Sequence, residues 1–120
     1  MGKKSVIIGA SDNPERYSFK ATSMLKQKGH QVYPVGIRAG KIDKEDILLG
    51  KPQLPDIDTV TLYVGPKNQP EWFDYVLSLH PKRLIFNPGT ENPEFVKLAE
   101  KQGIECVEAC TLVMLSIGNY

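Results

Sequence analysis

Short apolar runs recur along the chain and alternate with segments whose apolar residues repeat at helical spacing. The runs predict strands near 5–9, 31–35, 59–64, 83–87 and 104–107. The helical spacing predicts helices near 18–28, 68–79 and 92–102, with a short helix at 111–117. Strands that alternate with helices through short connections are typical of a parallel sheet covered by helices on both faces. We therefore predict the α/β class, with a Rossmann-like, doubly wound parallel sheet in a single domain over residues 1–120.

Residues 37–58 interrupt this alternation between the second and third predicted strands. The segment is rich in Gly, Pro, Lys and Asp, and it carries a short apolar patch at 47–49. It is too long for a simple turn and too broken for a helix, and loops of this length often carry function or minor structure. Residues 51–54 could add a short edge strand to the sheet.

Composition and charge exclude several classes of protein. The chain of 120 residues has 15 basic and 14 acidic residues, a net charge of +1 and no long block of like charge, which argues against nucleic-acid binding. The 2 cysteines are too few for a disulfide scaffold in a domain large enough for its own core. The first residues, MGKKSV, form no apolar leader, and the apolar runs fall far short of the ~20 residues that span a bilayer. We therefore expect a cytoplasmic protein with no membrane or nucleic-acid partner.

The stretch SVIIGASDN, residues 5–13, carries the first functional signal. A buried strand ends at Gly9, and the small or polar residues Ala10, Ser11 and Asn13 follow before the first helix. A strand, a tight turn and a helix start together present backbone N–H groups that suit a phosphate. At Gly9 we expect an added Cβ to point into this crevice rather than into the core. Only the first glycine of the G-x-G-x-x-G fingerprint is present, so a plain turn between strand and helix remains the alternative.

The end of the second predicted strand carries information about the ligand. Sites for NAD place an acidic residue about 20 residues past the glycines. Residues 29–36 contain none, and Arg38 and Lys41 follow instead. These cations favour a phosphorylated adenosine ribose, as in coenzyme A or NADP, which a carboxylate would repel. The alternative is that both side chains belong to a solvated loop.

Several segments resemble one known family. VIIGASDNPERYS, HQVYPV, ILLG followed by DIDTVTLYV, and FVKLAEKQGIECVEAC together cover nearly the whole chain, and G-A-S-D-N-P-x-R is the most specific part. On these segments the chain resembles the small stand-alone CoA-binding proteins, which are themselves similar to the CoA-binding N-terminal domain of the succinyl-CoA synthetase α subunit. Family members often read P-V-N-P at the second strand, whereas this chain reads P-V-G-I at 34–37, which removes an asparagine contact.

The resemblance implies a binding site for coenzyme A or an acyl-CoA, and it implies roles for individual residues. The pyrophosphate would lie against Gly9, Ala10, Ser11 and Asn13. The adenosine ribose and its phosphate would lie among Pro34, Val35, Gly36, Arg38 and Lys41. The adenine side of the crevice would be lined by Tyr63 and Val64, and the thiol end of the ligand would approach Cys110.

The sequence contains no recognisable catalytic or metal-binding constellation. It has no Ser-His-Asp order, paired-carboxylate motif or P-loop, neither histidine lies at a predicted strand end, and Cys106-x-x-x-Cys110 lacks further zinc ligands. We therefore predict a non-catalytic binding or regulatory module, and we leave open a protein partner or a second copy of the chain. The alternatives are an NADP-binding Rossmann domain and an interaction module whose nucleotide site has decayed.

Overall fold

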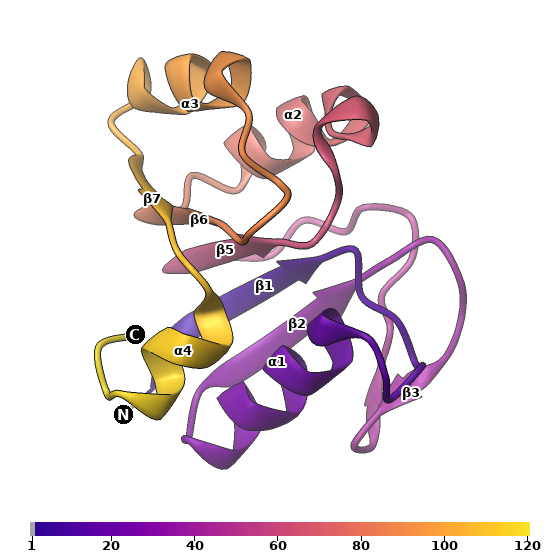
Figure 1. The fold of residues 1–120 in the computed structure, drawn as a ribbon. Coiled ribbons are helices and arrows are strands. Elements are labelled where there is room, and N and C mark those ends of the chain that lie inside the picture. Colours follow the sequence, from indigo (N-terminus) through magenta and orange to yellow (C-terminus); the bar gives the residue numbers. More distant parts are fainter. Residues whose placement is uncertain (1) are drawn as a thin grey trace.

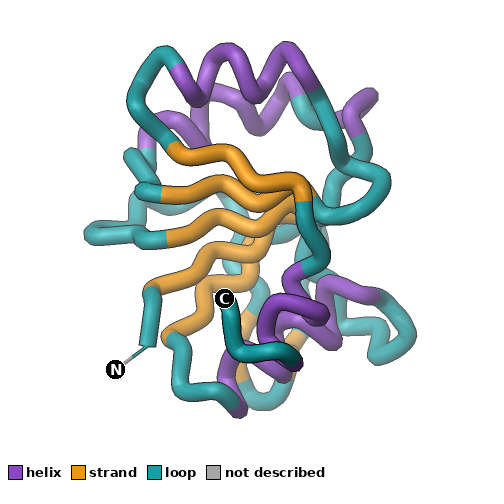
Figure 2. Tube along the Cα trace, turned by 60° about the vertical axis from the view of Figure 1, so that its left-hand side comes forward, coloured by secondary structure: helices purple, strands orange, loops and turns teal. Residues whose placement is uncertain are grey.

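The central element of the fold is a sheet of parallel strands, as the hydrophobic pattern predicts. In the computed structural model, which describes residues 2–120, the strands are β1 (Lys4–Ile8), β2 (Gln31–Val35), β5 (Thr59–Leu62), β6 (Arg83–Phe86) and β7 (Glu105–Glu108). They lie side by side in the order β2-β1-β5-β6-β7, and every neighbouring pair is parallel (Figure 2). The chain moves outward from β1 to β2 and then continues on the other side of β1, so the strand order reverses between β1 and β5. The predicted Rossmann-like α/β class is confirmed.

Helices cover both faces of this sheet (Figure 1). One face packs against α1 (Tyr17–Gln27) and α4 (Thr111–Ser116), and the other against α2 (Pro70–Ser78) and α3 (Pro93–Glu100). Successive side chains of a strand point to opposite faces, so Val6 and Ile8 join the core under α2 and α3, whereas Ile7 joins the core under α1 and α4. Burial of β1 on both faces explains its uninterrupted apolar run. None of the helices within residues 2–120 combines the length and the apolar character that crossing a membrane requires.

The segment 37–58 contains a short hairpin in place of the expected strand near 51–54, so that prediction is wrong. The hairpin pairs β3 (Lys41–Ile42) with β4 (Glu45–Asp46) in antiparallel fashion. Residues 51–54 form no strand, because Pro52 has no N–H for a ladder and its carbonyl accepts a hydrogen bond from the Tyr75 hydroxyl (2.7 Å) instead. Two-residue strands carry too few positions for a periodic sequence signal.

Leu48 covers the outer edge of β2 near its carboxyl end. Its N–H donates to the Pro34 carbonyl (2.8 Å), and its own carbonyl accepts from the Gly36 N–H (3.1 Å). These bonds form a parallel bridge between Leu48 and Val35. Because Pro34 has no N–H, this edge of the sheet offers few free groups to a further strand.

Candidate functional site

A cleft of about 550 Å³ opens over the loops that follow the strands, at the point where the strand order reverses. Its walls come from the loops after β1, β2, β5 and β6 and from the first turn of α1. Sheets of this kind bind their ligands at this place, outside the carboxyl ends of the strands. The lining residues are Gly9, Ala10, Ser11, Asp12, Asn13, Arg16, Tyr17, Ser18, Ile37, Arg38, Ala39, Ile47, Tyr63, Gly65, Pro88, Gly89 and Thr90.

Gly36 allows the loops after β1 and β2 to pack closely. The N–H groups of Gly9 and Ala10 both donate to the Val35 carbonyl (3.0 Å each), which ties the loop after β1 to the end of β2. A Cβ at Gly36 would lie only 2.7 Å from the Ala10 carbonyl oxygen. This close approach is a physical reason for glycine at the position where family members often carry asparagine.

Gly9 itself does not face the open cleft in the way that the sequence suggests. Its φ is +91°, and an added Cβ would lie 3.0 Å from both the Tyr63 carbonyl oxygen and the Val64 Cγ2 atom. The expectation that this Cβ would point into the crevice is therefore wrong. The loop after β5 occupies that space, so the fold itself requires glycine at position 9.

Ser11 and Asn13 shape the loop through bonds of their own. The Ser11 hydroxyl accepts a hydrogen bond from the Asn13 N–H (3.1 Å), and the Asn13 Oδ1 atom accepts one from the Glu15 N–H (3.0 Å). Side-chain bonds of this local kind hold a turn in one conformation. The loop therefore reaches the start of α1 in a defined shape, with Ser11 and Asn13 on the cleft wall.

The first turn of α1 presents unpaired donors at the cleft. The N–H groups of Tyr17 and Ser18 have no acceptor within residues 2–120, because the first residues of a helix lack a preceding turn. Ser18 is 4 % exposed and lines the cleft, and its hydroxyl donates no hydrogen bond to any described residue. Unpaired N–H groups at the positive end of a helix dipole favour an anion.

Arg16 and Arg38 supply the positive charge of the cleft. Arg16 lines the cleft from the residue before α1, and Arg38 lines it from the loop after β2. Neither forms an ion pair with a described residue.

Lys41, expected beside Arg38, lies in β3 and outside the cleft lining, where its Nζ contacts Asp46 Oδ1 (2.8 Å). The hydrogen bond that Lys41 donates to Asp46 raises the pKa of Lys41. Sequence reasoning missed Arg16, although it stands in the specific G-A-S-D-N-P-x-R segment.

Five further predicted residues lie outside the cleft lining: Pro34, Val35, Gly36, Val64 and Cys110. Val35 is fully buried, and Val64 packs against the core under α2 and α3. Cys110 is the half-buried residue that precedes α4. Tyr63, by contrast, does line the cleft beside Gly65. Tyr63 and Val64 are neighbours, yet one lines the cleft and the other packs against the core, because successive side chains of an extended segment point in opposite directions.

Four of the lining residues that the sequence analysis did not single out are direct neighbours of residues that it did: Asp12, Ile37, Ala39 and Gly65. Ile37 and Ala39 flank Arg38, and Pro88 to Thr90 follow β6. Ile47 belongs to the apolar patch at 47–49, but that patch did not indicate a place at the cleft. Ile47 reaches the cleft because its N–H donates to the Gly40 carbonyl (2.9 Å), which folds the hairpin segment back over the loop after β2.

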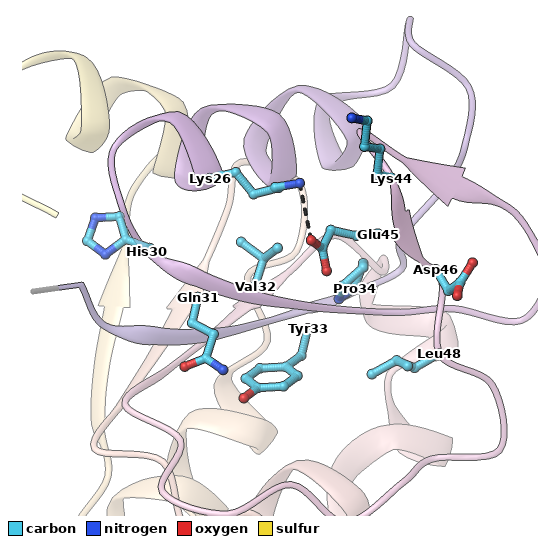
Figure 3. A pocket seen from close by; sticks show the side chains of 10 residues that line it. All are labelled: Lys26, His30, Gln31, Val32, Tyr33, Pro34, Lys44, Glu45, Asp46 and Leu48. Atoms are coloured by element: carbon cyan, nitrogen blue, oxygen red, sulfur yellow. Dashed lines mark ion pairs between the residues drawn. The ribbon is translucent and has the colours of Figure 1, made fainter.

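A second groove, of about 540 Å³, runs along the outer edge of β2 (Figure 3). Figure 3 shows Val32 and Pro34 of β2 near Lys26 of α1 and Glu45 of β4, and these last two form an ion pair (Nζ–Oε2, 3.1 Å). Two of the charged groups that line this groove, Lys26 and Glu45, therefore already have an ionic partner. No described residue from the loops after β1, β5 or β6 lines the groove. We therefore place the candidate site in the cleft.

Within residues 2–120, no group of three or more His, Cys, Asp or Glu side chains is arranged to hold a metal ion. The thiol of Cys106, in β7, is half-buried. Burial raises the pKa of Cys106 to about 11, so this thiol is protonated and unreactive at neutral pH.

Comparison with solved structures finds the same fold in other proteins. One crystal structure, described as that of an uncharacterized protein, is 46% identical with a TM-score of 0.97, and the match covers 100% of this chain and 99% of that one. A hypothetical protein from Pyrococcus horikoshii OT3 is 26% identical with a TM-score of 0.84, over 97% of this chain and 83% of that one. A conserved hypothetical protein from Pyrococcus furiosus is 28% identical with a TM-score of 0.80, over 92% and 97% of the two chains. None of the curated protein sequences compared with the chain matches it.

A family model described as a CoA binding domain matches residues 3–116. The matched range includes every strand of the central sheet, the loop after β1 and the first turn of α1. Because the match spans nearly the whole chain, the protein belongs to the CoA binding domain family.

Proposed function

We propose that the cleft binds coenzyme A or an acyl-CoA and that the protein acts as a non-catalytic binding module. Membership of the CoA binding domain family supports the ligand class. The observation that carries the proposal is the combination, in one cleft, of unpaired helix donors and two arginines without ionic partners. A bound anion would accept hydrogen bonds from these donors and pair with both arginines.

The pyrophosphate of the ligand would lie at the start of α1. The N–H groups of Tyr17 and Ser18 and the Ser18 hydroxyl are available there as donors. Arg16 adds a positive charge at the same end of the helix. Helix donors and a guanidinium together match the two phosphates of a pyrophosphate, which carries acceptor oxygens on every side.

The two arms of the ligand would extend to opposite sides of this point. Arg38, in the loop after β2, would contact the phosphate on the adenosine ribose. Exposed apolar side chains of Tyr17 (68%) and Ile37 (78%) stand on the cleft lining and would gain cover from the adenosine. The pantetheine arm would then run past Gly65 and the loop after β6.

The lining residues offer binding groups rather than a catalytic set. Asp12 is the one carboxylate among the described lining residues, and neither a histidine nor a cysteine stands among them. Asp12 packs against the backbone at Gly40, where an added Cβ would lie 2.7 Å from Oδ2. The hydroxyl groups of the lining are of kinds that take part in catalysis, but none of them is hydrogen-bonded to the Asp12 carboxylate among the described residues, so the lining holds no paired nucleophile and base.

Isothermal titration calorimetry of the purified chain with CoA, acetyl-CoA, NADP and NAD tests the proposal. We expect CoA and acetyl-CoA to bind in the titration. In a separate thermal unfolding experiment they should raise the melting temperature, because a ligand at 100 times its Kd adds about 2.7 kcal/mol to the stability of the folded state. Arg16→Gln should weaken CoA binding, and Lys41→Gln is the matched control because Lys41 already pairs with Asp46 outside the cleft.

Binding of NADP but not of CoA would instead support the NADP-binding alternative. No binding of any of these ligands at millimolar concentration would support the interaction module with a decayed site. Equal losses of CoA affinity in the two variants would show that general positive charge, and not the cleft, attracts the ligand.

A further inference from the structure

A fully buried amide side chain joins two of the loops that line the cleft. Gln69, between the 3-10 turn η1 (Pro66–Asn68) and α2, is 0% exposed. Its Nε2 group donates to the Val64 carbonyl (2.8 Å) in the loop after β5 and to the Thr90 carbonyl (2.7 Å) in the loop after β6. Both hydrogens of this amide are therefore used to link the two loops.

The other end of the amide is held in place as well. The Gln69 Oε1 atom accepts a hydrogen bond from Asn92 Nδ2 (2.9 Å). Asn92 is itself fixed as the N-cap of α3, since its Oδ1 accepts from the N–H groups of Glu94 (3.1 Å) and Phe95 (3.3 Å). This bond sets which way the Gln69 amide faces, because a flipped amide would bring two donors together.

The bonded carbonyls stand directly beside the cleft. Gly65, which follows Val64, lines it, and so do Gly89 and Thr90. The turn that carries Thr90 is tight, because the Asn87 carbonyl accepts from both the Thr90 N–H (2.9 Å) and the Thr90 hydroxyl (2.8 Å). Gln69 thus connects two short, stiff segments on the same wall.

We propose that Gln69 is a positioning residue that sets the shape of the cleft wall along which the pantetheine arm of the ligand runs. The inference rests on the proposed function. Gln69 makes no hydrogen bond to the loop after β1, to the first turn of α1 or to Arg38. Loss of the Gln69 amide should therefore weaken binding of the pantetheine arm alone. A general loss of stability would weaken binding of both arms.

The test compares CoA with adenosine 3′,5′-bisphosphate, which keeps the adenosine and its phosphates but lacks the pantetheine arm. Gln69→Met has a similar volume and no hydrogen-bonding amide. In calorimetry it should weaken CoA binding by about tenfold and change the Kd of the bisphosphate by less than about twofold. Equal losses for the two ligands, or no loss for either in a folded variant, would overturn the role of Gln69.

Asn92→Asp is a milder second variant in case Gln69→Met does not fold. It keeps the cap oxygen for Glu94 and Phe95 but replaces the donor to Gln69 with an acceptor. The Gln69 amide should then turn its Nε2 group toward the carboxylate and release a loop carbonyl. The loss of CoA affinity should have the same direction, about threefold, again without effect on the bisphosphate.

Tyr75→Phe is the control for a lost side-chain-to-backbone bond, because the Tyr75 hydroxyl donates to the Pro52 carbonyl (2.7 Å) and does not line the cleft. It should lower the melting temperature and leave both Kd values unchanged.

Amide hydrogen exchange gives a readout that needs no ligand. Exchange should be faster across 63–66 and 87–91 in the Gln69 and Asn92 variants, and unchanged across 9–18. Unchanged exchange in the loops together with unchanged CoA affinity would overturn only the role of Gln69. Failure of the unmutated protein to bind CoA would instead overturn the proposed function, while the exchange data would still show whether Gln69 holds the loops.

Discussion

Arg38→Gln should reduce the preference of the protein for CoA over 3′-dephospho-CoA. The two ligands differ only in the phosphate on the adenosine ribose. Arg38 lines the cleft on the side of β2 and has no ionic partner among the described residues, so its guanidinium is available to that phosphate. Glutamine keeps part of the side-chain length and the capacity to donate a hydrogen bond, and it removes the charge.

The magnitude follows from the exposure of Arg38 in its loop. Hydrogen bonds to charged groups contribute roughly 1.5–3 kcal/mol. Exposed ion pairs are screened by solvent and salt and fall well below that range, so we expect about 1 kcal/mol here. This free energy corresponds to an affinity ratio of about five between CoA and 3′-dephospho-CoA.

Calorimetric titration of the unmutated protein, Arg38→Gln and Lys41→Gln with both ligands provides the measurement. In Arg38→Gln the two Kd values should converge, mainly through weaker CoA binding. In Lys41→Gln the ratio should persist, because Lys41 pairs with Asp46 and does not line the cleft. Equal affinity of the unmutated protein for the two ligands, or loss of the ratio in the Lys41 variant alone, would refute this reasoning.

Two further predictions concern stability. Gly9→Ala should destabilise the fold in chemical denaturation by about 1–2 kcal/mol or more, because φ is +91° and the new Cβ would crowd the Tyr63 carbonyl oxygen at 3.0 Å. A variant as stable as the unmutated protein would contradict the packing described for this loop. The pKa of His30 is lowered by burial and by the nearby positive charges of Lys3 and Arg83, so the folded protein prefers the neutral imidazole, whose Nδ1 accepts from the Lys3 N–H (2.9 Å). The contribution of His30 to the unfolding free energy should be fully present above pH ~6.5 and be lost as the pH falls below that value. His30→Asn should therefore flatten this part of the pH profile of the unfolding free energy. Identical profiles for the variant and the unmutated protein would contradict the role given to His30.

The strands were predictable because of how they are buried. Val6, Ile7 and Ile8 of β1 are all fully buried, since helices cover both faces of the sheet, and such a run is apolar without interruption. The hairpin of β3 and β4 left no comparable pattern. Its one fully buried position is Ile42, and contacts with a segment distant in sequence help to hold it, including the bond from the Ser23 hydroxyl to Asp43 and the ion pair of Lys26 with Glu45.

The sequence by itself determined the order of strands and helices, the position of the loop after β1 and the presence of a cation at position 38, because each depends on residues close together in the chain. The tertiary structure alone decided which side chains face the cleft. Lys41 is drawn away by Asp46, and Arg16 takes a place on the cleft wall. The same holds for Gln69, whose three partners come from the loops after β5 and β6 and from the cap of α3. Charge pairing and hydrogen bonding of this kind depend on the distance between atoms in space, which the local sequence pattern does not record.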